Sequence, residues 1–137
     1  MNPLLLTDSY KFTHHRQYPP KTTRLYSYLE SRGGRFPETV FFGLQYVLKE
    51  FLSKPIRPAD IVEARELCAL HFSSRDLFNE AGFEAILRRH DGYWPVSIKA
   101  VPEGSVVPML NTLITMENTD PELPWVTNFL ETLMVQV

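Results

Sequence analysis

Acidic, basic, imidazole and phenol side chains are concentrated in one short segment near the start of the chain. The segment reads Thr7-Asp8-Ser9-Tyr10-Lys11-Phe12-Thr13-His14-His15-Arg16-Gln17-Tyr18-Pro19-Pro20. Almost no aliphatic side chains occur between Leu6 and Leu25. A buried segment would need a partner for every one of these polar groups. The composition therefore predicts a polar loop, either one that binds a ligand or one that is merely solvated.

A strand is predicted directly after this loop, because the side chains alternate with a period of two. Its two faces would carry Leu25, Ser27, Leu29 and Ser31 on one side and Tyr26, Tyr28, Glu30 and Arg32 on the other. The second face combines two phenols, a carboxylate and a guanidinium, which suits an aromatic, anionic small molecule. The simpler alternative is an ordinary edge strand at the surface.

The candidate binding groups on or near this loop and strand are Asp8, Tyr10, Lys11, His14, Arg16 and Arg32. These groups can bind and orient a ligand, but no familiar catalytic motif accompanies them. The chain has no glycine-rich phosphate loop, no HExxH zinc motif and no nucleophile elbow. His14 and His15 are adjacent, so on a strand they would face opposite ways and could not share a metal ion. We therefore predict a binding surface without a catalytic residue and without metal ligands.

Composition narrows the class of protein. The chain has 137 residues, of which 44% are hydrophobic and 22% charged, so it can form one domain with a buried core. Its net charge of −2 argues against binding nucleic acid by phosphate neutralisation. Cys68 is the only cysteine, which excludes an intrachain disulfide, and its apolar neighbours predict a buried, inert thiol. No apolar window is long enough for a membrane span or a signal peptide, so we expect a soluble cytoplasmic protein.

The elements that must hold the binding surface follow from hydrophobic periodicity. Amphipathic helices are predicted at residues 41–52, 58–72 and 79–90. Alternating residues predict strands at 96–101, 105–108 and 113–117. In the second helix the inner stripe would consist of Ile61, Ala64, Leu67 and Cys68. Together these elements predict an α/β (α+β) domain, with a mixed, mainly antiparallel sheet and helices packed on it.

A final helix is predicted at about residues 124–137, and its apolar face is wider than a surface helix of a small domain needs. The sequence stops inside this helix with no cap and no polar tail. Natural carboxyl termini are usually solvated and frayed. We therefore expect a single domain over residues 1–137 whose last helix looks truncated.

Three long segments carry a family resemblance. They read TDSYKxTHxxQYPPxTxxxYSYxExR, ETVFFGLQYVLKEFL and IKAVPEGSVVPMLNTLITMENTDPELPWVTNFLETLMVQ. In this order they resemble the amino-terminal part of nicotinamide phosphoribosyltransferases, and the match includes polar positions that hydrophobic patterning does not dictate. The resemblance implies the amino-terminal domain of a type II phosphoribosyltransferase, without the (β/α) barrel that holds most catalytic groups in that family.

The implied activity is transfer of a phosphoribosyl group from phosphoribosyl pyrophosphate to nicotinamide. The products would be nicotinamide mononucleotide and pyrophosphate, in the salvage of NAD. The resemblance also implies a homodimer with its active sites at the subunit boundary, and no nucleic-acid or membrane partner. Mg²⁺ would be held by the complete enzyme rather than by this segment, and ATP is expected as an optional activating co-substrate. The segment alone is expected to be inactive.

The resemblance assigns roles to individual residues of the motif. Tyr10 would reach into the partner subunit's site and stack on the nicotinamide ring, because an aromatic face suits a pyridine that gains positive charge. Asp8 would help to orient that ring and its amide. Arg32 would bind the phosphate or pyrophosphate, for which a planar guanidinium is suited. Lys11 and His14 would have supporting roles.

Several alternatives stay open. Tyr10 could be a capping aromatic over the loop, and Arg32 could form an ion pair with Glu30 or a nearby acid. The chain could be a stand-alone dimerisation or regulatory module without activity, or part of a nicotinate phosphoribosyltransferase. The wide apolar face of the last helix is expected to contact the dimer partner or the barrel.

Overall fold

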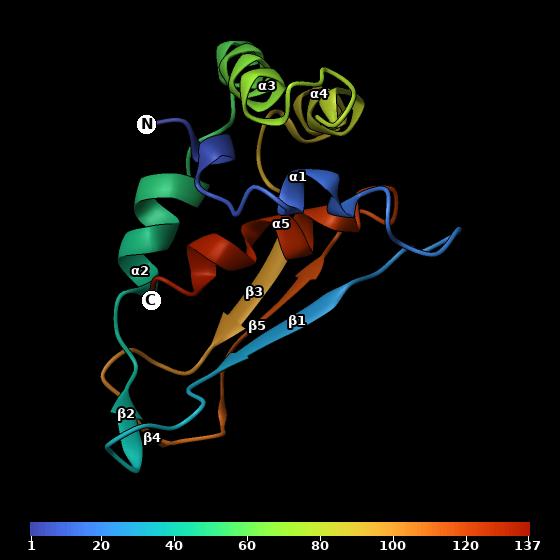
Figure 1. Ribbon diagram of the computed structural model, residues 1–137. Coiled ribbons are helices and arrows are strands. Elements are labelled where there is room, and N and C mark those ends of the chain that lie inside the picture. The colour runs from blue at the N-terminus through green and yellow to red at the C-terminus, as the bar shows by residue number, and fades with distance from the viewer.

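An antiparallel sheet of three strands lies at the centre of the molecule. The computed structural model describes residues 1–137 and places the strands in the order β1 (Tyr26–Glu30), β5 (Thr112–Asn118) and β3 (Val96–Ala100) (Figure 1). A second sheet pairs the short strands β2 (Glu38–Val40) and β4 (Val106–Pro108), also antiparallel. The mixed fold with antiparallel sheets confirms the predicted class.

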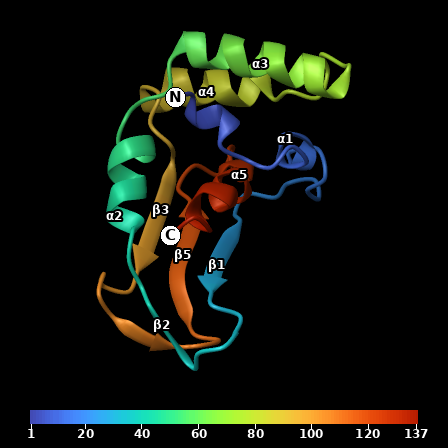
Figure 2. The ribbon, with the colours of Figure 1, turned by 60° about the vertical axis from the view of Figure 1, so that its left-hand side comes forward.

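The helical segments lie at one end of the larger sheet, beside it and on one of its faces (Figure 1). They are η1 (Pro3–Leu5), α1 (Lys11–His14), α2 (Leu44–Val47), the π-helical turn η2 (Leu48–Leu52), α3 (Pro58–Phe72), α4 (Glu80–His90) and α5 (Trp125–Met134). The helices α3 and α4 lie side by side at one end of the molecule, as both ribbon views show (Figures 1 and 2). The helix α5 packs on one face of the sheet, and α1 packs on α5. None of the helices has the length and apolar character that crossing a lipid bilayer requires.

Local signals in the sequence explain where α4 begins and ends. The side chain of Asn79 accepts a hydrogen bond from the backbone N–H of Gly82 at 3.2 Å, which caps the first turn. The helix ends where Asp91 and Gly92 both adopt positive φ, at +51° and +84°. A Cβ on Gly92 would lie 2.5 Å from the carbonyl oxygen of Ile56, so only glycine fits this close approach. The predicted helices at 58–72 and 79–90 are confirmed.

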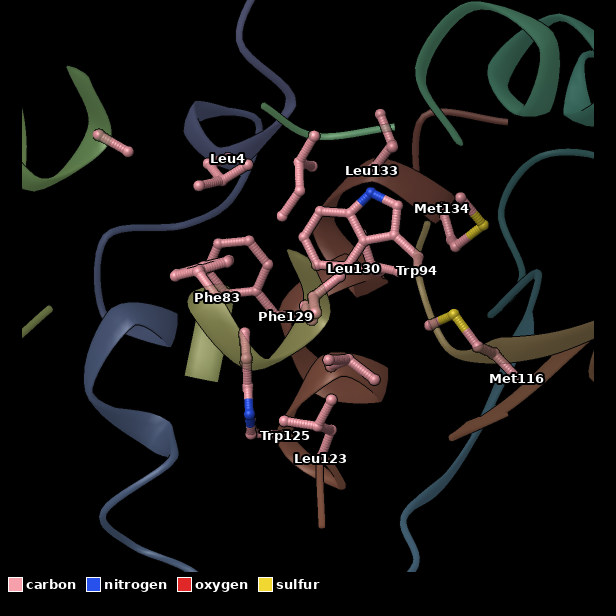
Figure 3. Packing of buried hydrophobic residues seen from close by; sticks show 14 of the residues in the cluster. Leu4, Phe83, Trp94, Met116, Leu123, Trp125, Phe129, Leu130, Leu133 and Met134 are labelled. Atoms are coloured by element: carbon pink, nitrogen blue, oxygen red, sulfur yellow. The ribbon is translucent and has the colours of Figure 1, made fainter. Parts of the chain in front are cut away.

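The hydrophobic core is built around α5, from which aromatic rings project toward α4 and the start of β3 (Figure 3). The ring of Phe129 lies 5.4 Å from that of Phe83, 5.6 Å from Trp125 and 6.0 Å from Trp94. Seven of the ten residues of α5 are buried in this chain: Trp125, Val126, Thr127, Phe129, Leu130, Leu133 and Met134. The expectation that the apolar face of this helix contacts a dimer partner or a barrel is therefore wrong, because the chain's own core covers it.

The region from residue 38 to 52 also differs from the prediction. The sequence predicts one helix over 41–52, whereas the structure has β2, then α2 and η2. Gly43, with φ of +114°, breaks the pattern before α2, and Glu103 caps this helix by accepting the backbone N–H groups of Gly43 and Gln45. Phe41 is buried, but Phe42 is 72% exposed and does not belong to an inner stripe.

Two smaller predictions concern α3 and the first loop. Cys68 is buried as expected, and burial raises the pKa of its thiol. Leu67 is 49% exposed, so its assignment to the inner stripe is wrong. The polar loop contains the one-turn helix α1, so His14 and His15 are consecutive in helical backbone rather than on a strand.

Candidate functional site

A cavity of about 750 Å³ opens between the first loop, the end of β1 and α5. This volume is common for small-molecule sites. It is lined by Asp8, Tyr10, Lys11, Tyr28, Leu29, Glu30, Ser31, Arg32, Thr39, Phe41, Leu113, Ile114, Glu131, Thr132, Met134, Val135 and Val137. Of the six candidate binding residues named from the sequence, Asp8, Tyr10, Lys11 and Arg32 line this cavity, whereas His14 and Arg16 do not. The fold thus brings two segments that are far apart in sequence to one cavity.

Asp8 and Tyr10 form a hydrogen-bonded pair at the edge of the cavity. The hydroxyl of Tyr10 donates to Oδ2 of Asp8 at 3.2 Å, and Oγ1 of Thr132 donates to the same oxygen at 2.6 Å. The contact with Thr132 holds the pKa of Asp8 below its ordinary value, and the contact with Asp8 raises the pKa of Tyr10. At neutral pH the pair is therefore an anionic carboxylate beside a neutral phenol. The Tyr10 side chain is 55% exposed, which leaves its ring available to a ligand.

Lys11 lines the cavity, but its ammonium group is paired with α5. Its side chain is 5% exposed, and its Nζ lies 3.0 Å from Oε2 of Glu131. The same oxygen accepts a hydrogen bond from Nδ2 of Asn128 at 2.8 Å, and Oε1 accepts one from the hydroxyl of Ser27. The carboxylate of Glu131 therefore accepts from three donors, one each on α1, β1 and α5. Its negative charge compensates the positive charge of the buried Lys11 ammonium.

His14 lies outside the cavity and connects the first loop to α5. Its Nδ1 forms a hydrogen bond with Oδ1 of Asn128. Because Nδ2 of Asn128 donates to Glu131, the amide oxygen faces the imidazole and the proton belongs on Nδ1 of His14. The imidazole is also in contact with Tyr10, at 5.1 Å between ring centroids. His14 is thus placed to orient Tyr10 and not to contact a molecule in the cavity.

Arg32 follows β1 at the opposite side of the cavity. A register shift between Leu29 and Glu30 changes the direction of the chain there. The backbone N–H of Leu110 donates a hydrogen bond to the carbonyl oxygen of Ser31 at 2.8 Å. The guanidinium is exposed and forms no ion pair with Glu30 or any other acid. It remains available to an anionic ligand.

The phenols of β1 separate into two groups. Tyr26 and Tyr28 point to the same face of the strand and are both exposed, as the alternating pattern predicts. Only Tyr28 lines the cavity, because Tyr26 lies at the far end of the strand, paired with Glu117. Glu30 is also a lining residue, so the cavity contains carboxylates as well as the guanidinium.

Sequence reasoning missed the contribution of α5. Glu131 and Thr132 line the cavity, and Asn128 joins Glu131 to His14. These polar residues recur at i, i+3 and i+4, so they form a narrow polar stripe in an otherwise apolar helix. That stripe was the available signal, since half-buried polar side chains on an apolar helix need partners from elsewhere in the chain.

The described residues contain no cluster that fits a metal ion. No group of three histidine, cysteine, aspartate or glutamate side chains lies close enough together to hold one. His90 instead pairs with Asp120 at 2.7 Å, where Arg89 also contacts the carboxylate at 3.1 Å. Burial opposes the charge of Asp120, but these partners keep its pKa below the ordinary value. This group joins α4 to the loop after β5.

Comparison with known proteins identifies the family. Residues 2–98 match the family model described as "Nicotinamide phosphoribosyltransferase, N-terminal domain". The chain is 50% identical over 136 residues to the nicotinamide phosphoribosyltransferase of Xanthomonas campestris pv. campestris, covering 99% of this chain and 28% of that protein. It is 35% identical over 147 residues to the nicotinamide phosphoribosyltransferase of Acinetobacter baylyi, covering 98% and 29%.

A third relative, the nicotinamide phosphoribosyltransferase of Mycoplasma pneumoniae, is 28% identical over 152 residues, covering 97% of this chain and 34% of that protein. The chain therefore spans about a third or less of the length of these curated relatives. The family model covers well over half of the chain, and the match begins ahead of the first loop and includes β1. The chain belongs to the nicotinamide phosphoribosyltransferase family, in the part that corresponds to its amino-terminal domain.

Proposed function

We propose that this chain is the amino-terminal domain of an enzyme that transfers a phosphoribosyl group from phosphoribosyl pyrophosphate to nicotinamide. The products would be nicotinamide mononucleotide and pyrophosphate. The observation that carries the proposal is the cavity at which the neutral phenol of Tyr10, the anionic carboxylate of Asp8 and the unpaired guanidinium of Arg32 meet. Family membership supports the same reaction.

The three side chains suit the charges that this reaction develops. The pyridine nitrogen of nicotinamide attacks the anomeric carbon of the ribose, and the bond from that carbon to the pyrophosphate oxygen breaks. The electron pair of the broken bond leaves with pyrophosphate, and the pyridine becomes cationic. The ring face of Tyr10 would stabilise that cation. Arg32 would bind phosphate oxygens with parallel N–H groups.

Asp8 gives a reason for a preference for the amide. Its Oδ2 is occupied by Tyr10 and Thr132, so Oδ1 is the oxygen that can accept the amide N–H of nicotinamide. The carboxylate of nicotinate has no such donor, and an anionic Asp8 would repel it. We therefore propose nicotinamide, rather than nicotinate, as the preferred substrate.

The chemistry is divided between this domain and the remainder of the proposed enzyme. The cavity supplies binding groups, and we assign no residue of this chain to proton transfer or nucleophilic attack. Magnesium would neutralise the leaving pyrophosphate in the complete enzyme, but the residues present here do not form a site for it. Optional activation by ATP would likewise depend on other parts of the enzyme.

Tyr10 is also suited to serve a second subunit. Its ring is more than half exposed at the edge of the cavity, so it can enter the site of a partner in a homodimer. Under this proposal Arg32 enters the same foreign site, because both residues line one cavity of this chain.

Substitutions in the complete enzyme that carries this chain would test the assignment. Tyr10→Ala should raise the KM for nicotinamide by about tenfold, the equivalent of about 1.4 kcal/mol of lost stacking, with little change for phosphoribosyl pyrophosphate. Arg32→Ala should raise the KM for phosphoribosyl pyrophosphate, with little change in the KM for nicotinamide. Tyr26→Ala is the matched control, since this phenol is 59% exposed but does not line the cavity. Equal behaviour of Tyr10→Ala and Tyr26→Ala would show that nicotinamide binds elsewhere.

One observation favours a second candidate, a binding or regulatory module without activity. The apolar face of α5 is covered by the chain's own core, as expected for a unit that folds by itself. Both candidates predict that the 137-residue chain alone forms no nicotinamide mononucleotide. They differ in the complete protein, where only the first predicts turnover that responds to Tyr10 and Arg32. Measurable turnover by the pure chain would contradict both.

A further inference from the structure

Two of the segments that line the cavity are not joined to each other by hydrogen bonds, and each is called a wall below. One wall is the first loop with Asp8 and Tyr10, and the other is β1 with the following Arg32. No hydrogen bond joins residues 7–18 directly to residues 24–32. The relative position of these walls must therefore be set by a third element.

Glu131 on α5 is the residue that hydrogen-bonds to both walls. Its Oε2 pairs with Nζ of Lys11 in α1 at 3.0 Å, and its Oε1 accepts the hydroxyl of Ser27 in β1. Asn128 adds a third donor to the carboxylate and extends the contact to His14. Other anchors serve only one wall, as Thr132 does for Asp8 and the carbonyl of Phe129 does for Thr7.

We infer that Glu131 is a positioning residue, which fixes the Tyr10 loop at a set distance from β1 and thereby from Arg32. The inference rests on the proposed function, because it concerns the placement of Tyr10 against nicotinamide while Arg32 holds the phosphate end. Glu131 would act through Lys11 and Ser27 rather than by contact with the reacting atoms.

The physical reason is that the loop cannot hold its own shape. The helix α1 has only four residues, and a helix of one turn is not stable in isolation. The ammonium of Lys11 is almost fully buried, so loss of the carboxylate would leave an unpaired charge inside the domain. The loop would then move outward to solvate Lys11 and would carry Tyr10 with it.

The first measurement uses the 137-residue chain, whose own residues bury the apolar face of α5. Hydrogen exchange should become faster in residues 8–14 of Glu131→Gln, because the amide retains the shape of the carboxylate but loses its charge. Asp60→Asn is the matched control. Asp60 is a buried carboxylate that pairs with Arg57, but it lies in α3 and does not line the cavity. This control should lose stability without faster exchange in residues 8–14.

The second measurement uses the complete enzyme. Glu131→Gln should raise the KM for nicotinamide by up to about tenfold, the limit set by complete loss of the Tyr10 contact, because it acts through the placement of that ring. The KM for phosphoribosyl pyrophosphate and the values for Asp60→Asn should stay close to wild type. Equal changes in Glu131→Gln and Asp60→Asn would overturn the inference, because general destabilisation would explain both.

Ser27→Ala keeps the inference testable if Glu131→Gln does not fold. It removes one donor to Glu131 and leaves Lys11 paired, so no charge is stranded. The KM for nicotinamide should rise in the same direction by a smaller factor, and an unchanged KM would overturn the inference. Tyr10→Ala separates failure of the proposed function from failure of the positioning role. If it raises the KM for nicotinamide while Glu131→Gln and Ser27→Ala do not, the proposed function stands and the positioning role is wrong.

Discussion

Phe129 connects the hydrophobic core to the candidate site, and its replacement gives the sharpest test of the fold. The ring is 3% exposed and contacts Phe83, Trp125 and Phe12 edge-to-face, at 5.4, 5.6 and 5.5 Å between centroids. Phe12 belongs to α1, so this ring anchors the loop that carries Tyr10. The change Phe129→Leu would retain an apolar side chain and remove the ring contacts.

The size of the effect follows from these contacts. An edge-to-face pair contributes about 0.5–1.5 kcal/mol beyond the area that it buries, and pairs that share one ring do not add fully. We therefore expect Phe129→Leu to lower the free energy of unfolding by about 2 kcal/mol. For a chain of this size that corresponds to a fall in Tm of roughly 6–10 °C. Phe129→Ala should cost about 3–5 kcal/mol, because it also leaves a cavity.

Thermal and urea unfolding of the 137-residue chain, followed by circular dichroism, would measure these losses. Phe42→Leu is the matched control, since Phe42 is 72% exposed and should change stability by less than about 0.5 kcal/mol. If Phe129→Leu lowers the Tm no more than Phe42→Leu does, the aromatic cluster around α5 is not the core of this domain.

Three further outcomes are expected. The hydrogen bond from Thr132 holds the pKa of Asp8 below 3.8, so this contact stabilises the fold above pH 3.8, and the stabilisation is lost as pH falls through the lowered pKa. The difference in stability between Thr132→Val and wild type should therefore shrink in that acidic range, as urea unfolding across pH would show. Glu103→Ala should cost about 1 kcal/mol in urea unfolding, because it removes the cap of α2. Gly92→Ala should lower the Tm more than Gly34→Ala: both have positive φ, but only at Gly92 would the new Cβ collide with backbone, so equal losses would contradict the assigned contact.

The elements that the sequence predicts well are those whose own residues determine them. The helices α3 and α4 have clear periodicity and end signals such as Asn79 and Gly92, and their bounds agree with the prediction within about one residue. The strand β2 was missed because it has three residues and exists by pairing with β4, about seventy positions away. The positive φ of Gly43, which separates β2 from α2, is not visible in the hydrophobic pattern.

The candidate site shows the same division. The residue types of Asp8, Tyr10 and Arg32 indicated binding chemistry, but their common cavity depends on contacts between distant segments. The wide apolar face of α5 indicated burial without saying what would cover it, and the expected external partner proved to be the chain's own core. Glu131 was missed because a polar residue on an apolar helix acquires its meaning only from the partners that the fold brings to it.

The anchoring of the first loop to α5 has a consequence for biosynthesis. The loop is among the first segments to leave the ribosome, whereas its hydrogen-bond partners lie 114 to 124 positions later in the chain. Contacts of such long sequence separation form late, because closing a long loop costs conformational entropy before the contact is gained. A nascent chain that stalls before α5 would leave the buried Lys11 and the ring of Phe12 in water, where chaperones and proteases recognise incomplete domains. Successful synthesis of α5 is therefore the event that both closes the core and completes the binding loop.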